Sequence, residues 1–182
     1  MGQLKENNLT ENKVKRQNEQ WKISYIGIGS NLDKPINQVK EAILNIKNLP
    51  KTCFIIASSL YESSPMGPAN QPKYINAVVA ILTLLEPHDL LSKLQHIEIQ
   101  QKRIRSAEKW SPRTIDLDLL VYSDEVMNKQ SLVLPHPGIQ HRNFVLAPLV
   151  EIAPDLVVKG LENVVDLLDK IQESEITIKI IN

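Results

Sequence analysis

The stretch Trp110-Ser111-Pro112-Arg113-Thr114-Ile115-Asp116-Leu117-Asp118-Leu119-Leu120 places two aspartates, two residues apart, inside an apolar run. In an extended strand successive side chains point to opposite faces, so Asp116 and Asp118 project together. The alternate residues are apolar and predict contact with a core; they are Ile115, Leu117 and Leu119. The stretch therefore predicts a strand with one buried face and one face that carries paired carboxylates.

The paired carboxylates indicate a cation site. Two carboxylates held close together repel each other, and each raises the cost of ionising the other. A cation relieves this repulsion, and Mg²⁺ takes one or two carboxylates together with substrate phosphates as its ligands. Arg113 stands at the entrance of the strand, where its guanidinium could hold a phosphate oxygen. The alternative for a bare Asp-x-Asp is a solvated strand face whose aspartates bind nothing.

Composition excludes several classes of protein. The chain has 182 residues, of which 42% are hydrophobic and 23% charged, as in a globular domain with a proper core. Its 21 basic and 21 acidic residues balance, which argues against a general nucleic-acid or membrane binder. Cys53 is the only cysteine, so no internal disulfide can form, and its apolar surroundings in the sequence favour a packed thiol. With one cysteine, no signal-peptide pattern and no membrane-spanning apolar run, we expect a cytoplasmic protein. We also expect it to be a monomer.

The order of predicted elements indicates an α+β fold. Residues 1–20 are polar and predict a flexible extension, so we expect one domain over residues 21–182. Strand patterns cover residues 23–28, 54–61, 74–85, the Asp116 strand, 132–134 and 176–181. Helical patterns run from Pro35 to Leu49, from Pro87, and over 144–150 and 164–171. This order is close to βαββαβ, which predicts a ferredoxin-like core sheet with helices on it and extra C-terminal elements.

Polar residues concentrate in the segments that flank these strands. Gly29-Ser30-Asn31 follows the first strand and is, by itself, typical of a plain turn. Tyr74 and Asn76 share a strand face and offer an aromatic surface beside an amide. Cations precede the paired aspartates in Arg103–Trp110, and His136, Arg142 and Phe144 form a further cluster. Together they predict nucleotide-dependent phosphoryl-type transfer to a flat acceptor, although neither a Walker A motif nor a protein-kinase signature occurs.

From Tyr25 to Val157 the chain resembles the 6-hydroxymethyl-7,8-dihydropterin pyrophosphokinase family of folate biosynthesis. The matching fragments, in order, are Ile28-Gly29-Ser30-Asn31-Leu32, Gly67-Pro68, Gln71-Pro72, Tyr74-Ile75-Asn76-Ala77, Gln95 with Glu98, Arg103-Ile104-Arg105, Trp110, Pro112-Arg113-Thr114-Ile115-Asp116-Leu117-Asp118, Pro135-His136-Pro137 and Arg142-Asn143-Phe144. The resemblance implies transfer of the β,γ-diphosphoryl group of ATP to the pterin hydroxymethyl group, with release of AMP.

The resemblance also implies roles for individual residues. Asp116 and Asp118 would hold two Mg²⁺ ions, and with Arg103 and Arg113 they would form the catalytic group. His136 and Arg142 would contact phosphates. The ATP site would be formed by Gln95, Glu98, Arg105, Trp110 and Leu119. The pterin would lie between Tyr74 and Phe144, with its edge read by Asn76 and by the chain around Ser63, Ser64 and Met66.

Three positions depart from the family pattern. Ser111 stands where the family usually has Gly or Ala, Ser106 where some members have lysine, and Gly138 where a basic residue is frequent. We expect altered loop behaviour from Ser111 and one weaker phosphate contact from Gly138.

Two other functions remain as alternatives. A two-metal nuclease or phosphatase also uses paired aspartates, but it leaves Tyr74, Asn76 and Phe144 without a role. An RNA-binding module would need aromatic strands and a basic face, whereas aromatic residues make up 4% of this chain.

Overall fold

The computed structural model describes residues 20–66, 70–104, 110–171 and 178–181. The strands are β1 (Lys22–Ser30), β2 (Thr52–Ala57), β3 (Leu60–Ser63), β4 (Tyr74–Thr83), β5 (Asp116–Tyr122), β6 (Met127–Lys129), β7 (Leu132–Leu134) and β8 (Ile178–Ile181). The α-helices are α2 (Pro35–Lys47), α3 (Pro87–Gln100), α4 (Asn143–Ile152) and α5 (Val164–Asp169), and a 3₁₀ turn covers Ile139–His141. The predicted mixture of helices with a sheet is confirmed.

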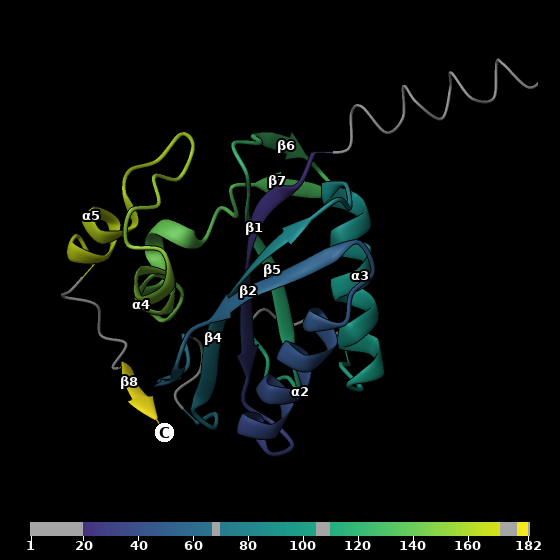
Figure 1. Cartoon of the computed structure of the whole chain (residues 1–182). Helices are drawn as coiled ribbons and strands as arrows, with labels where there is room; N and C mark the ends of the chain where they lie inside the picture. Colours follow the sequence, from purple (N-terminus) through teal and green to yellow (C-terminus); the bar gives the residue numbers. More distant parts are fainter. Residues whose placement is uncertain (1–19, 67–69, 105–109, 172–177, 182) are drawn as a thin grey trace, which may run out of the picture.

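A six-stranded antiparallel sheet forms the centre of the molecule (Figure 1). Its strands follow the order β5-β1-β4-β3-β8, and β2 pairs with the other end of β4. β6 and β7 form a separate hairpin, as expected after the Asp116 strand. β1 is therefore the central strand between β4 and β5, and this placement later decides which side chains meet.

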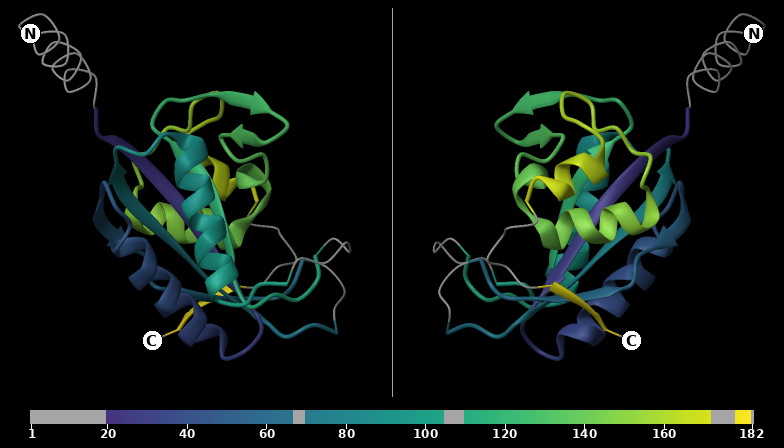
Figure 2. Two further views of the ribbon diagram at one scale, coloured as in Figure 1. Left: turned by 90° about the vertical axis from the view of Figure 1, so that its right-hand side faces the viewer. Right: turned by 90° about the vertical axis from the view of Figure 1, so that its left-hand side faces the viewer.

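Helices pack on both faces of this sheet and create two apolar clusters (Figure 2). α2 and α3 cover one face with residues at helical spacing, such as Val39, Ala42 and Ile46 of α2. Leu117 and Leu119 of β5 lie in the same cluster, which confirms the predicted core face of that strand. α4 and α5 cover part of the opposite face, to which Asp116 and Asp118 also belong.

The predicted strand over 54–61 is divided into two strands. A register shift lies between Phe54 and Ile56, and the chain then leaves the strand at Ser58 and Ser59. Ser58 repairs the interruption, because its N–H donates to the Val78 carbonyl and its Oγ accepts from the Val78 N–H. β3 consequently pairs with the pocket end of β4 and β2 with its far end.

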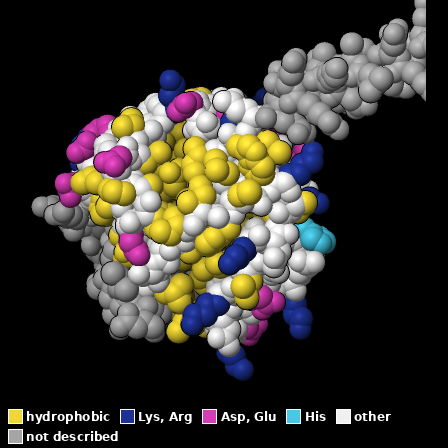
Figure 3. All heavy atoms as spheres, viewed as in Figure 1, with side chains coloured by type: hydrophobic (Ala, Val, Ile, Leu, Met, Phe, Trp, Pro, Cys, Tyr) yellow, Lys and Arg dark blue, Asp and Glu magenta, His cyan; other side chains and the backbone are white. Residues whose placement is uncertain are grey.

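Apolar side chains gather on the sheet face that is seen in Figure 3. Ile55 and Ile56 of β2 and Trp21 before β1 are among the exposed large hydrophobic residues. Cys53 of β2 is exposed as well, so the prediction of a packed thiol is wrong. The reason is that only part of this sheet face is covered by α4 and α5.

Two further observations concern the chain as a whole. Among the helices within the described ranges, none is both long and apolar enough to cross a bilayer. The predicted N-terminal extension, apart from residue 20, lies outside the described residues.

Candidate active site

A pocket of about 310 Å³ lies on the face of the sheet that also carries α4. Its floor is β1, where Gly27 and Gly29 expose backbone instead of side chains. Gly29 is paired with Asn76 of β4 on one side and with Asp116 of β5 on the other. Adjacent strands lie about 4.8 Å apart, so the amide and the carboxylate face the same space about 10 Å apart.

Two aspartates line the wall formed by β5, as the strand alternation predicts. Ile115, Leu117 and Leu119 are fully buried on the other face, which fixes the orientation of the strand. Gly27 and Gly29 are the cross-strand partners of Asp118 and Asp116, so no neighbouring side chain on β1 covers the carboxylates. Both aspartates are consequently accessible to a ligand in the pocket.

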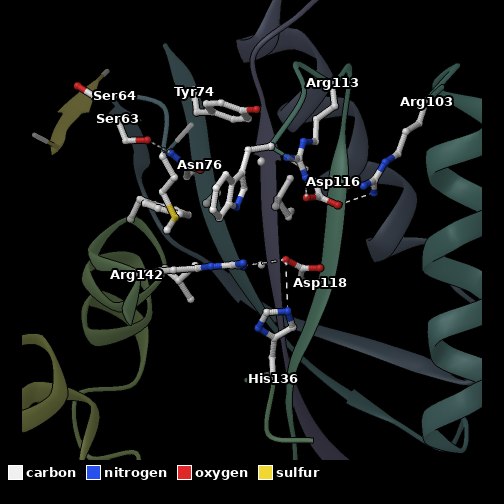
Figure 4. A pocket seen from close by; sticks show the side chains of 18 residues that line it. Ser63, Ser64, Tyr74, Asn76, Arg103, Arg113, Asp116, Asp118, His136 and Arg142 are labelled. Carbon is white, nitrogen blue, oxygen red and sulfur yellow. Dashed lines mark hydrogen bonds and ion pairs between the residues drawn. The ribbon is translucent and has the colours of Figure 1, made fainter. Parts of the chain in front are cut away.

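Asp116 is neutralised by two arginines that approach from different segments (Figure 4). Arg113, just before β5, contacts one carboxylate oxygen, and Arg103, just after α3, contacts the other. Arg103 also contacts Glu98, a buried residue of α3 that accepts the Leu117 N–H at 2.8 Å. Burial lowers the pKa of Arg113, but the charges and hydrogen bonds of Asp116 and Tyr74 together outweigh it, so the net pKa is raised. The Arg113 guanidinium is therefore held as a cation at the pocket wall.

Asp118 has weaker compensation than Asp116. Its Oδ2 lies 3.6 Å from Arg142 Nη1 and 3.9 Å from His136 Nε2. Burial, followed by the charge of Asp116, raises the pKa of Asp118. The positive charges of His136, Arg142 and Arg103 oppose this shift. The ionised form of Asp118 therefore retains an unfavourable interaction that a further cation would relieve.

His136 points a nitrogen–hydrogen donor into the pocket. Its backbone N–H donates to the Leu120 carbonyl, which fastens the loop to β5. The Gly138 N–H donates to His136 Nδ1 at 3.0 Å, so in the neutral ring the proton lies on Nε2, the atom nearer Asp118. Burial lowers the pKa of His136, against the attraction of Asp118. The ring is thus oriented as a donor toward negative charge.

The other side of the pocket is aromatic and amide in character. It is lined by Tyr74 and Asn76 of β4, by Phe144 of α4, and by Ser63, Ser64 and Met66. Asn76 Nδ2 donates to Ser63 Oγ at 2.9 Å and to the Tyr61 carbonyl at 3.3 Å. Both of these bonds use the amide nitrogen, so Oδ1 is the Asn76 atom that is presented as an acceptor to a ligand. The predicted aromatic and amide residues are therefore brought together.

Asn31 is a positioning residue that the sequence reading missed, because Gly29-Ser30-Asn31 is typical of an ordinary turn. The Asn31 side chain is buried; Nδ2 donates to the Pro72 carbonyl and Oδ1 accepts the Arg113 N–H at 2.8 Å. It thereby joins the segment before Tyr74 to the segment that carries Arg113. Nearby, Tyr74 Oη donates to the Ser111 carbonyl and Gln71 to the Trp110 carbonyl.

Of the residues that the resemblance implies for ATP binding, some line the pocket and others do not. Trp110 lines the pocket and is half-exposed. Gln95 and Glu98 lie on α3 outside the pocket lining, with Glu98 supporting Arg103 instead. Leu119 is buried in the core on the face of β5 turned away from Asp118, so its side chain does not line the pocket. Arg105 and Ser106 lie outside the described residues.

Among the described residues that line the pocket, Asp116 and Asp118 are the carboxylates that could hold a metal. Within the described part of the chain there is no group of three or more His, Cys, Asp or Glu residues arranged for a metal. Two carboxylates are sufficient for a hard cation that keeps water ligands and shares a substrate's phosphates. They would be too few for a closed structural zinc site, which takes four protein ligands.

Known proteins match this chain over most of its length. The sequence profile of the family described as 7,8-dihydro-6-hydroxymethylpterin-pyrophosphokinase (HPPK) matches residues 25–154. A 2-amino-4-hydroxy-6-hydroxymethyldihydropteridine pyrophosphokinase of Haemophilus influenzae is 43% identical over 145 residues, which cover 80% of this chain and 90% of the relative. The enzyme of the same name from Pseudomonas aeruginosa is 45% identical over 132 residues, covering 72% and 81%.

Solved structures resemble the fold. A Plasmodium falciparum HPPK-DHPS, crystallised with pterin and p-hydroxybenzoate, superposes with a TM-score of 0.67 and 14% identity. The match covers 87% of this chain and 45% of that longer chain, and at this identity it concerns the fold alone. The family profile and the two bacterial relatives carry the assignment, and they agree with the site: the chain belongs to the 7,8-dihydro-6-hydroxymethylpterin-pyrophosphokinase family.

Proposed function

We propose that this chain transfers the β,γ-diphosphoryl group of ATP to the hydroxymethyl group of 6-hydroxymethyl-7,8-dihydropterin in folate biosynthesis. The pterin oxygen bonds to the β-phosphorus, the bond from that phosphorus to the oxygen of the α-phosphate breaks, and AMP leaves. The hydroxyl proton is released. The observation that supports this most is that, within one pocket, paired carboxylates with cations face an aromatic and amide wall across two glycines.

Asp116 and Asp118 would hold Mg²⁺ between the protein and the ATP phosphates. Their fit to the ion rests on two adjacent carboxylates and on the raised pKa of Asp118, which arises from burial and then from the charge of Asp116. When bound, Mg²⁺ neutralises phosphate charge and acidifies the attacking hydroxyl. The two carboxylates would bind the ion and thereby orient the ATP phosphates. The protein then needs no separate general base.

Four cationic or donor side chains would bind the phosphates. Arg103 and Arg113 contact Asp116, whereas Arg142 and His136 face Asp118. A divalent cation that satisfies the two carboxylates would free these side chains to donate to phosphate oxygens. Diphosphoryl transfer needs such charge neutralisation and positioning more than it needs covalent chemistry by the protein.

The opposite wall would select the pterin. Tyr74 and Phe144 offer faces for a flat ring, and Asn76 Oδ1 offers an acceptor for a ring N–H. Ser63 fixes which end of the Asn76 amide faces the ligand. We assign Trp110 to closing the site over ATP, and Gln95, Glu98 and Arg105 to its nucleoside side.

The remaining features of the enzyme are also proposals. The element order β1-α2-β2/β3-β4-α3-β5 and its antiparallel pairing support a ferredoxin-like topology, with α4, α5 and β8 as additions. Apolar clusters on both faces of one sheet support a single domain over residues 21–182. The balanced charge argues against a nucleic-acid partner, and the lone cysteine supports a cytoplasmic location. We also propose that the chain acts as a monomer.

The proposal is tested by measuring AMP release from ATP and Mg²⁺, with and without 6-hydroxymethyl-7,8-dihydropterin. We expect AMP only when the pterin is present. ADP as the product, or nucleotide turnover indifferent to the pterin, would contradict the proposed acceptor and would favour a phosphatase-like use of the same carboxylates.

A further inference from the structure

Gly138 lies at the rim of the pocket, between His136 and Arg142. It precedes the 3₁₀ turn Ile139–His141 in the loop that β5 holds through the His136 N–H. The resemblance to the family predicts only a weaker phosphate contact here, because a basic residue is frequent at this position of the family. In the structure, the guanidinium of Arg142 occupies the space beside Gly138 that a side chain would fill.

The backbone does not require glycine at this position. The φ and ψ angles of Gly138 are −87° and −4°, in the right-handed helical region that every residue adopts readily. A side chain at residue 138 would therefore cause no backbone strain. Any effect of a substitution must come from the atoms that the new side chain meets.

A Cβ atom at position 138 would meet the flexible end of the Arg142 side chain, so the guanidinium would have to move from its present position. It would lie 2.7 Å from both Cζ and Nε of Arg142, and 3.0 Å from Cε1 of His136. The guanidinium of Arg142 thus lies directly against the Gly138 backbone, and from this seat Nη1 reaches to 3.6 Å from Asp118. Figure 4 shows Arg142 and His136 converging on Asp118 from two sides.

We propose that Gly138 is a positioning residue, whose missing side chain seats the Arg142 guanidinium beside His136 so that both face Asp118 and the phosphates of bound ATP. The inference rests on the proposed function for the identity of the ligand. It adds that the binding of the phosphates depends on an empty volume at residue 138. Arg142, held in that volume, supplies positive charge beside His136 and 3.6 Å from Asp118.

The test is the binding of Mg²⁺ with α,β-methylene ATP, an analogue that cannot release AMP, to the full chain and to Gly138→Ala. Alanine keeps the N–H that donates to His136 Nδ1, so this variant isolates the effect of the Cβ atom. We expect binding about tenfold weaker, the order of one displaced charge-assisted contact. The free energy of unfolding should not fall, because alanine suits the backbone angles and restricts the unfolded chain.

Gln140→Ala is the matched control, because Gln140 is exposed in the same loop, two residues away. We expect it to bind the analogue as the unchanged chain does. Equal binding by Gly138→Ala and the unchanged chain would overturn the proposal.

A double-mutant cycle tests whether Gly138 acts through Arg142. Arg142→Ala should weaken binding, and adding Gly138→Ala to it should weaken binding little further. If the two losses are instead additive, Gly138 acts elsewhere and the proposal is wrong. Failure of the proposed function would appear separately, as an absence of pterin-dependent AMP release by the unchanged chain, whereas the cycle depends on binding alone.

Discussion

Asp116 and Asp118 differ in how completely their charges are compensated. Two guanidinium groups contact Asp116 directly, whereas Arg142 and His136 remain 3.6 and 3.9 Å from Asp118. Burial and the charge of Asp116 accordingly raise the pKa of Asp118. Asp118 is therefore the carboxylate with most to gain from a divalent cation, and it is the residue at which the metal role is tested best.

We predict that Asp118→Ala loses about 10²- to 10³-fold or more in kcat, because one of the two proposed Mg²⁺ ligands is removed. The free energy of unfolding should be unchanged or higher, since the ionised carboxylate is disfavoured in the folded chain. Steady-state kinetics and denaturant unfolding measure the two effects. Asp124→Ala, at an exposed carboxylate beyond the same strand, is the control and should change neither. An Asp118→Ala enzyme with near-normal kcat would refute the metal role.

Ser63 would act on the proposed pterin site through Asn76. Its hydroxyl is buried and accepts a hydrogen bond from Asn76 Nδ2, which directs Oδ1 toward the ligand. The second acceptor of the same nitrogen, the Tyr61 carbonyl, is farther away at 3.3 Å. Without Ser63 Oγ, the Asn76 side chain would keep only the weaker hydrogen bond to Tyr61, so its orientation would be less strongly fixed.

We predict that Ser63→Ala raises the KM for the pterin about three- to tenfold, consistent with the loss of one buried hydrogen bond. The KM for ATP should change much less, because Ser63 lies on the wall opposite Asp116 and Asp118 (Figure 4). Initial rates at varied pterin and varied ATP separate the two constants. Ser92→Ala, on the exposed side of α3, serves as the control. An equal rise in both KM values would contradict the role assigned to Ser63.

The sequence predicted the positions of individual side chains correctly where these depend on a single strand. Alternation within β5 predicts the shared face of Asp116 and Asp118 and the burial of Leu117. It cannot reveal Asn31, whose role comes from contacts with Pro72 and Arg113, 41 and 82 residues away. Gly138 is hidden for the same reason, because its importance is the volume that Arg142 occupies.

Among the elements, α4 is held against the sheet by a polar contact in addition to its apolar face. Glu151, near its end, accepts hydrogen bonds from the N–H and hydroxyl of Ser59 and from Tyr61 Oη, at 2.8 to 2.9 Å. Burial first, then the bond to Glu151, raises the pKa of Tyr61 to about 12. The contact joins α4 to the interruption between β2 and β3, close to the strand that carries Ser63.

We predict that Glu151→Ala lowers the free energy of unfolding by about 1–2 kcal/mol, because three donors lose a charged acceptor that is itself partly exposed to water. Glu41→Ala, at an exposed position of α2, should change it by less than about 0.5 kcal/mol. Urea unfolding of the three chains measures the difference. Equal stability of the Glu151 and Glu41 variants would show that the apolar face alone holds α4.

Element-scale prediction recovered the helices and most strands, because their periodicities are clear. α2 and α3 begin at Pro35 and Pro87, as the helix start signals predict. The predicted strand over 54–61 failed at Ser58, because a bulge and a side-chain contact with Val78 depend on the pairing with β4. Apolar β-branched sequence alone does not reveal such an interruption.

For the molecule as a whole, the antiparallel register of β4, β1 and β5 creates the active site. It aligns Asn76, Gly29 and Asp116 across three strands, while Arg103, His136 and Arg142 arrive from segments outside those strands. No local pattern contains this alignment, although the resemblance to a family predicts most of its residues. In the proposed reaction this one pocket transfers two phosphates as a unit.

The most direct test follows both labels of ATP in the same reaction. The full chain is incubated with Mg²⁺, 6-hydroxymethyl-7,8-dihydropterin and ATP labelled at either the α- or the γ-phosphate, and the products are separated. We predict that the γ label appears in a pterin diphosphate and the α label in AMP, in equal amounts. A pterin carrying one labelled phosphate together with labelled ADP, or γ label released as free phosphate or diphosphate, would contradict the account.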